Sequence, residues 1–191
     1  MIIKKKRLCR KQPLKLSHSP SVIDKQLNYF WIIKTFNMKL NPYLNFDGNA
    51  EEAFKFYQTV FGGELFLQRM NQAPGTESLP EDEKNRVMHV SIPIGDGQFL
   101  MASDCVPSMG HVLKVGNNNY ISITPDSRKE ADRLFNGLSA GGKVEMPIAD
   151  MFWGDYFGSF EDKFGVRWMI NFSNKENTYG LKEDMKTEAV H

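Results

Sequence analysis

His89 is the side chain of this 191-residue chain best suited to acid–base chemistry, because histidine titrates near neutral pH. In the run from Met88 to Ile94, strand alternation puts His89 and Ser91 on one face and apolar residues on the other. If the apolar face packs against a helix, His89 points to the opposite side, where it could bind a ligand or act as a base. A hydrogen-bonded structural histidine is the alternative. We therefore assign no catalytic residue and keep His89 as the candidate.

Three aspartates are further candidates for acid chemistry, but their positions favour structural roles. Asp104, Asp155 and Asp162 each stand beside a predicted turn or strand end, where aspartate commonly accepts backbone hydrogen bonds. The only GxG, from Gly95 to Gly97, lies in a predicted hairpin, so it does not support a nucleotide or S-adenosylmethionine site. The sequence shows no CxxC pair, no Ser-His-Asp arrangement and no phosphate-binding loop. We expect no cofactor.

Charge and cysteine usage narrow the class of protein. Residues 1–37 hold nine basic residues and one acidic residue, whereas the remainder holds 15 basic and 22 acidic residues. An acidic body is a poor match for nucleic acid, whose phosphates require a basic surface. Cys9 and Cys105 are the only cysteines, so we expect no disulfide and a cytoplasmic location. No apolar run approaches the roughly 20 residues of a membrane span, so no membrane partner is expected.

The sequence divides into an extension, a patterned domain and a tail. We interpret the basic residues 1–37 as a disordered or non-native extension, because regular patterning begins near Met38. A basic arm that contacts RNA or membrane is the alternative. The domain is predicted over 38–173, with modules near 40–104 and 117–173. The polar residues 174–191 are predicted to form a loosely held tail.

The first module is predicted to run strand–helix–strand–strand–strand. Its helix begins with a capping signal, Asn49 followed by Glu52, and ends at the pair Gly62-Gly63. The segment 71–85 is long for a loop, which predicts either disorder or a flap over a site. Strands are predicted over 41–46, 65–70, 87–94 and 98–103.

The second module repeats the first. The cap, apolar face and closing glycine pair recur at offsets of 78 or 79 residues, in a helix that follows Ser127 and ends at Gly141-Gly142. The final two strands form a hairpin rich in aromatic residues, turned near Asp162 to Gly165. That these rings only fill a core is the alternative. Strands are predicted over 118–124, 144–148, 154–160 and 166–173.

Three segments carry more specific patterns: FDGNAEEAFKFYQTVFGGEL, MHVSIPIGDGQFLMASD and FWGDYFGSFEDKFGVRWMINF. With the duplication, they resemble the vicinal oxygen chelate superfamily, the glyoxalase/bleomycin resistance/dioxygenase group. The closest likeness is to its PhnB-like branch, often labelled 3-demethylubiquinone methyltransferase-like. The resemblance implies an α+β fold in which two βαβββ modules form one curved eight-stranded mixed sheet, with helices outside and a concave cup. It also implies a homodimer.

Metal enzymes of this superfamily take ligands, normally His or Glu, from the first and fourth strands of each module. The equivalent positions here are Asn41 or Pro42, Met101, Asn118 and Met169. None of them offers the imidazole or carboxylate that divalent metals prefer, so no metal site is predicted. This departure weakens the case for glyoxalase-type or dioxygenase-type catalysis.

Strand alternation and the resemblance together predict which side chains line the cup. They are Tyr43, Asn45, His89, Ser91, Met101, Asn118, Tyr120, Ser122, Trp153, Tyr156, Arg167 and Met169. Such a surface suits a small, partly apolar or aromatic ligand, so we expect a small-molecule binding protein that works without a metal. Three alternatives stay open. Side chains could fill the cup; the protein could be a lyase or oxidoreductase using His89 or an atypical metal site; or it could be a methyltransferase, on the branch label alone.

Overall fold

The structure, a computed structural model, describes residues 39–173, so the predicted extension 1–37 and tail 174–191 lie outside the described residues. The elements follow the predicted order, with strand ends shifted by a few residues. In chain order they are β1 (Tyr43–Phe46), α2 (Ala50–Phe61), β2 (Phe66–Arg69), η1 (Met70–Gln72), α3 (Glu81–Lys84), β3 (Val87–Gly95), β4 (Gln98–Asp104), η2 (Pro107–Met109), β5 (Ile121–Ile123), α4 (Arg128–Ser139), β6 (Lys143–Asp150), β7 (Asp155–Glu161) and β8 (Arg167–Ser173).

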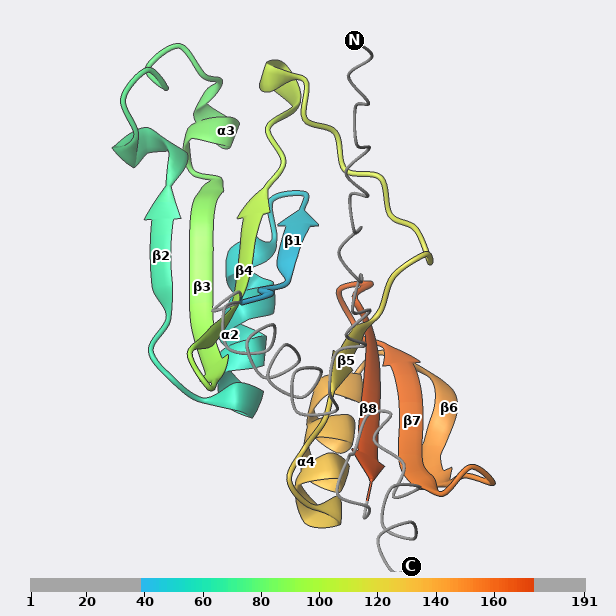
Figure 1. Ribbon diagram of the computed structural model, residues 1–191. Coiled ribbons are helices and arrows are strands. Elements are labelled where there is room, and N and C mark those ends of the chain that lie inside the picture. The colour runs from blue at the N-terminus through green and yellow to red at the C-terminus, as the bar shows by residue number, and fades with distance from the viewer. Residues whose placement is uncertain (1–38, 174–191) are drawn as a thin grey trace, which may run out of the picture. The chain divides into compact units, whose positions relative to one another are not determined.

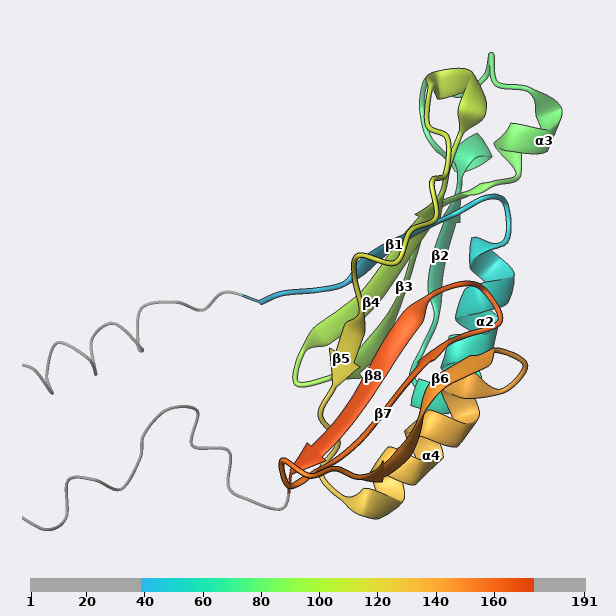
Figure 2. The ribbon, with the colours of Figure 1, turned by 90° about the vertical axis from the view of Figure 1, so that its right-hand side faces the viewer.

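Two four-stranded sheets hold these strands, in the orders β1-β4-β3-β2 and β5-β8-β7-β6. In each sheet the first strand of the module runs parallel to its last, and the other neighbours are antiparallel. The α+β fold of two βαβββ modules is thus confirmed, with the eight strands divided between two open sheets. Helices α2 and α4 lie on the same side of the strands (Figures 1 and 2). We call the opposite surface of the two sheets the open face.

Alternation along the strands separates the core from the open face. In β3, Val90 and Ile92 are fully buried on the side of α2, whereas His89 and Ser91 are half-buried on the open face. The turn that follows β3 has positive φ at both Asp96 (48°) and Gly97 (67°), as a two-residue hairpin requires. The predicted faces of this strand and the predicted hairpin turn are therefore confirmed.

The two modules are joined through a buried carboxylate, that of Asp162 in the turn between β7 and β8. Its Oδ2 accepts hydrogen bonds from the Tyr57 hydroxyl of α2 (2.7 Å) and from the indole Nε1 of Trp168 (2.9 Å). Its Oδ1 accepts from the backbone N–H groups of Phe164 (2.8 Å) and Val166 (3.0 Å). Burial, and then the negative charge of Asp162, raise the pKa of Tyr57, so its hydroxyl stays a donor. The structural role predicted for Asp162 is confirmed.

The helices of the two modules also meet directly. Arg133 of α4 donates from Nη1 to the backbone carbonyl of Val60 in α2 (2.6 Å). Gly137 sets how close the helices come, because a Cβ at this position would lie 3.2 Å from Cγ1 of Val60. The core is therefore continuous from one module to the other.

The predicted cap of α2 is wrong, whereas the predicted cap of α4 is confirmed. The Asn49 side chain makes no capping hydrogen bond. Instead Asp104, at the end of β4, accepts from the N–H groups of Gly48 (2.9 Å) and Ala50 (3.0 Å). An aspartate 54 residues away thus satisfies the helix N-terminus, which local spacing does not reveal. In α4, Ser127 Oγ accepts from the Glu130 N–H, as expected.

The long segment 71–85 is ordered structure, so the expectation of a disordered loop is wrong. It contains α3, whose Glu83 is buried and accepts hydrogen bonds from the backbone N–H of Ser108 (3.1 Å) and from the Ser108 hydroxyl. This contact ties the segment to the start of the connection between the modules. Its possible action as a flap stays a prediction.

We expect Asp162→Ala to lower the free energy of unfolding by about 3 kcal/mol, since it leaves buried donors of Tyr57 and Trp168 without an acceptor. Urea unfolding followed by far-UV circular dichroism measures the change. Glu64→Ala removes an exposed carboxylate and should change the free energy by less than about 0.5 kcal/mol. Equal losses in the two variants would contradict the role given to Asp162.

The capping correction gives a second comparison. Asp104→Ala should cost about 2 kcal/mol of stability, because three backbone N–H groups, including that of Val87, lose their acceptor. Asn49→Ala should be nearly neutral, because its side chain caps nothing. The same urea titration compares them, and a larger loss for Asn49→Ala would restore the local cap that the sequence predicts.

Candidate functional site

A row of side chains crosses the open face of the first sheet. Tyr43, Met101, Ser91 and Phe66 are register partners on β1, β4, β3 and β2. The outer two rings remain accessible, with Tyr43 48% exposed and Phe66 52% exposed. No described element covers these two rings, and a group of accessible rings on one sheet face is a candidate binding surface.

His89 lies between the two rings of this row. Its imidazole centroid is 6.0 Å from that of Tyr43 and 6.2 Å from that of Phe66. Within residues 39–173 these ring contacts are the interactions of the imidazole, and no side chain or backbone group there hydrogen-bonds to it. The alternative of a hydrogen-bonded structural histidine therefore finds no support, and the ring nitrogens stay available to a ligand.

The open face of the second sheet carries a charged cluster around Arg167. Its Nη1 donates to the Tyr120 hydroxyl oxygen (3.1 Å) and to Glu145, and its Nη2 donates to Glu161 (2.6 Å). The Tyr120 hydroxyl in turn donates to Glu145 Oε2 (2.7 Å). The hydrogen bond from Tyr120 and the charge of Arg167 hold the pKa of Glu145 below its ordinary value.

Glu145 and Glu161 are missing from the residues that the sequence predicts for the site. Glu161 could have been found, because the hairpin register places it directly opposite Arg167. Glu145 could not, because irregularities in the pairing of β6 with β7 change its register on either side of Met146.

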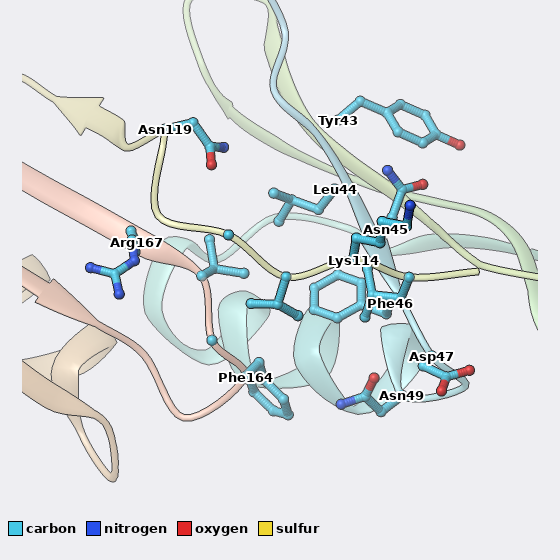
Figure 3. A pocket seen from close by; sticks show the side chains of 15 residues that line it. Tyr43, Leu44, Asn45, Phe46, Asp47, Asn49, Lys114, Asn119, Phe164 and Arg167 are labelled. Atoms are coloured by element: carbon cyan, nitrogen blue, oxygen red, sulfur yellow. The ribbon is translucent and has the colours of Figure 1, made fainter. Parts of the chain in front are cut away.

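A pocket of about 540 Å³ lies beside β1, between that strand, the connection near Lys114 and the turn that leads into β8 (Figure 3). It brings together Tyr43, Asn45 and Arg167, three of the predicted site residues. Leu44 and Phe46 from β1, Phe164 from the turn and Leu113 from the connection give it an apolar lining. The pocket therefore mixes apolar side chains with polar ones, among them Asn45, Lys114 and Arg167.

Other predicted site residues lie elsewhere, and Tyr156 requires a correction. Its hydroxyl donates to Asp132 of α4 (2.6 Å), so the ring faces the helix side and not the open face. The reason is strand alternation: Tyr156 and Phe160 are four residues apart on β7, so they point to the same face, and Phe160 is fully buried there. Trp153 lies in the turn between β6 and β7, 4.8 Å from Phe152 between ring centroids, and not beside His89.

Ser122 and Met169 keep the face expected of them, whereas the strand predicted to begin at Asn118 is wrong there, because β5 begins at Ile121. Ser122 and Met169 are register partners on β5 and β8. Met169 alternates with buried Trp168 and Ile170, which places it on the open face of the second sheet. Asn118 is exposed in the connection between the modules, so it lines no strand.

The positions equivalent to the superfamily's metal ligands do not fit a divalent ion. Asn41 Oδ1 already accepts a hydrogen bond from the Phe99 N–H (2.9 Å), and Met101 and Met169 offer only thioethers. Across the described residues, no group of three or more His, Cys, Asp or Glu side chains is placed to hold a metal ion.

The Arg167 cluster predicts a pH dependence. Because the folded state lowers the pKa of Glu145, the stability that its contacts contribute is fully present above the unfolded pKa of about 4.3. That contribution is lost as the pH falls through the lower, folded pKa. We expect wild type to exceed Glu145→Gln in Tm at pH 7, with the difference vanishing in stronger acid. A constant difference from pH 7 to pH 3 would contradict the ion pairing.

Comparisons with known proteins place these features in a family. A family model described as 3-demethylubiquinone-9 3-methyltransferase matches residues 38–171. Protein YjdN of Escherichia coli (strain K12) is 34% identical over 155 residues, which cover 74% of this chain and 99% of that protein. In the 39–173 range, no helix combines the length and apolar character that crossing a membrane requires.

Two solved structures share the fold. Protein PA1353 from Pseudomonas aeruginosa is 39% identical, with a TM-score of 0.63, over 72% of this chain and 98% of that one. The PhnB protein from Bacillus cereus is 24% identical, with a TM-score of 0.56, over 71% of this chain and 100% of that one. The second likeness supports the fold alone.

Proposed function

The chain belongs to the family whose model is described as 3-demethylubiquinone-9 3-methyltransferase. From that premise, and from the resemblance of its motifs to the PhnB-like branch of the vicinal oxygen chelate superfamily, we propose that it binds a small, partly apolar or aromatic molecule on its open face. Binding takes place without a metal. The observation that carries the proposal is the row of accessible rings, Tyr43 and Phe66 with His89 between them, together with the pocket beside β1. The ligand covers the exposed parts of these rings, which no described part of the chain covers.

Each part of the row has a role in this proposal. Covering a half-exposed aromatic side chain contributes about 1 kcal/mol or more to binding, because apolar surface leaves water. A planar ligand gains further from offset or edge-to-face contact with the rings. His89 then orients the ligand by a hydrogen bond, and the Met101 thioether adapts to its outline.

An enzyme with His89 as general base is the second candidate. The observation that favours it is the imidazole flanked by rings, with no hydrogen-bond partner among the described residues. Proton transfer needs such a group within reach of the substrate and with a free nitrogen. Methyl transfer is not part of the proposal, because the only GxG of the chain forms the turn between β3 and β4.

We also propose that the protein is a cytoplasmic homodimer. Support comes from the resemblance to its superfamily and from cysteine usage, with two cysteines in the whole sequence. Sedimentation equilibrium tests the dimer without requiring that the ligand be known.

The binding proposal is tested with matched phenylalanine variants and a thermal-shift screen of aromatic and quinone-like compounds. A compound that binds only the folded state raises its Tm. Phe66→Ala should weaken the best compound by about five- to tenfold, since it removes part of the ring row. Phe152→Ala removes a 97% exposed ring outside the row and should leave the affinity unchanged.

Three results would contradict the proposal. The first is a screen without any shift in Tm, and the second is equal weakening of binding by Phe66→Ala and Phe152→Ala. The third is stoichiometric transition metal in the purified protein that is lost in His89→Ala, which would favour a metal enzyme.

A further inference from the structure

We propose that an extended peptide bearing a carboxylate binds along the unpaired edge of β1, in the pocket beside that strand. The proposal goes beyond the proposed function, because it uses the backbone of β1 and not the rings of the open face. Its first support is the lining of the pocket, to which five consecutive residues, 43–47, contribute (Figure 3). Successive side chains of a strand point to opposite faces, so a pocket that both sets line runs along the edge of the strand.

Backbone hydrogen bonds show which residues of β1 face this pocket. The N–H of Met101 donates to the carbonyl of Pro42 (3.1 Å), and the carbonyl of Phe46 accepts from the residue that follows β4 (2.7 Å). In a parallel pair the backbone groups of alternate residues face the same neighbour, so those of Tyr43 and Asn45 face away from β4. Among the described strands, β1 pairs with β4 alone. The N–H and C=O groups of Tyr43 and Asn45 therefore form an unpaired edge beside the pocket.

The other strands at sheet edges carry features that oppose the addition of a strand, whereas β1 does not. Proteins commonly block such edges with charged residues, proline, bulges or very short strands. β6 carries Lys143 and Pro147 and pairs irregularly with β7, and β2 pairs irregularly with β3 at Arg69. β5 has only three residues. β1 has the sequence Tyr-Leu-Asn-Phe and a regular register throughout, so its edge can accept a further strand.

The charges of the pocket favour a ligand with a carboxylate. Three charged residues line it, and two of them have partners within the protein: Asp47 pairs with Arg86 (2.7 Å), and Arg167 pairs with two glutamates. The third is Lys114, which makes no ion pair within residues 39–173. Its ammonium group is a counter-charge for a carboxylate of the peptide, which adds electrostatic complementarity to the backbone pairing.

The dimensions and lining of the edge define a probe. The four residues of β1 span about 13 Å, the length of an extended tetrapeptide. Side chains of an added strand alternate between the open face and the side of Leu44 and Phe46, which is apolar. The probe is therefore acetyl-Val-Thr-Val-Thr with a free carboxylate, because it alternates apolar and polar side chains of high strand propensity.

Two N-methylated forms of this peptide test strand addition to the wild-type full chain by isothermal titration calorimetry. One form is methylated at both valine nitrogens and the other at both threonine nitrogens. Only alternate N–H groups of an added strand face β1, so only one form loses the donors that pair with it. We expect the two affinities to differ by at least about fivefold.

Variants of the chain test the edge and the charge separately. Asn45→Pro removes an N–H of the edge, whereas Asn45→Ala removes the side chain alone, so the proline variant should bind the peptide at least about fivefold more weakly than the alanine variant. A peptide ending in an amide should bind wild type about three- to fivefold more weakly than the acid. Lys114→Gln should abolish that difference, and Lys129→Gln, which changes an exposed lysine of α4, should preserve it.

Each outcome has one meaning. No binding of the parent peptide, or equal affinities of the two methylated forms, overturns strand addition, and this comparison needs no variant that could fail to fold. A wild-type dimer that Asn45→Pro converts to a monomer also overturns it, because a second copy then occupies the edge. Equal affinities of acid and amide overturn the role of Lys114. If aromatic compounds raise the Tm while the peptide does not bind, the proposed function stands and this inference fails.

Discussion

One buried carboxylate holds the two halves of the domain together. Asp162 accepts four hydrogen bonds, two from its own turn and two from the side chains of Tyr57 and Trp168. Because Tyr57 belongs to the helix of the first module, the same carboxylate closes a hairpin and joins the modules. A buried charge is tolerated only when it is fully hydrogen-bonded, so these donors must all be in place. Together with the contact between α2 and α4 and the shared core, this carboxylate sets the relative position of the two sheet surfaces, and hence of the candidate site.

The helix side of each sheet packs against α2 or α4, so the side chains available to a ligand are those of the open face. The first sheet presents rings and an imidazole, and the second presents a guanidinium held between carboxylates. The two surfaces have different chemistry although the modules repeat the same order of elements. The repeated fold thus presents one largely apolar open-face surface and one surface that carries a charged, hydrogen-bonded cluster.

The fold was largely predictable from the sequence, because periodic burial and turn residues are local signals. Each of three confirmed features depends only on residues close together in the sequence. They are the turn at Asp96 and Gly97, the alternation in β3 and the Ser127 cap. The cap of α2 was not predictable in this way, because Asp104 reaches it from another strand. The site is predictable only in part for the same reason. Strand alternation turns Tyr156 toward α4, where it contacts Asp132. Glu145 contacts Arg167 from the edge strand β6, whose pairing is irregular and therefore not predictable from alternation.

The pairing of first with last strands has a consequence for synthesis on the ribosome. Tyr43 of β1 must wait for Met101 of β4, and the Tyr57 hydroxyl must wait for a carboxylate 105 residues later. When only the first module has left the ribosome, Tyr57 therefore has no hydrogen-bond acceptor, because Asp162 has not yet been synthesised. Until the second half emerges, the surface of α2 around this hydroxyl lacks its partner, and transiently exposed surface of this kind makes a partly folded chain prone to aggregation.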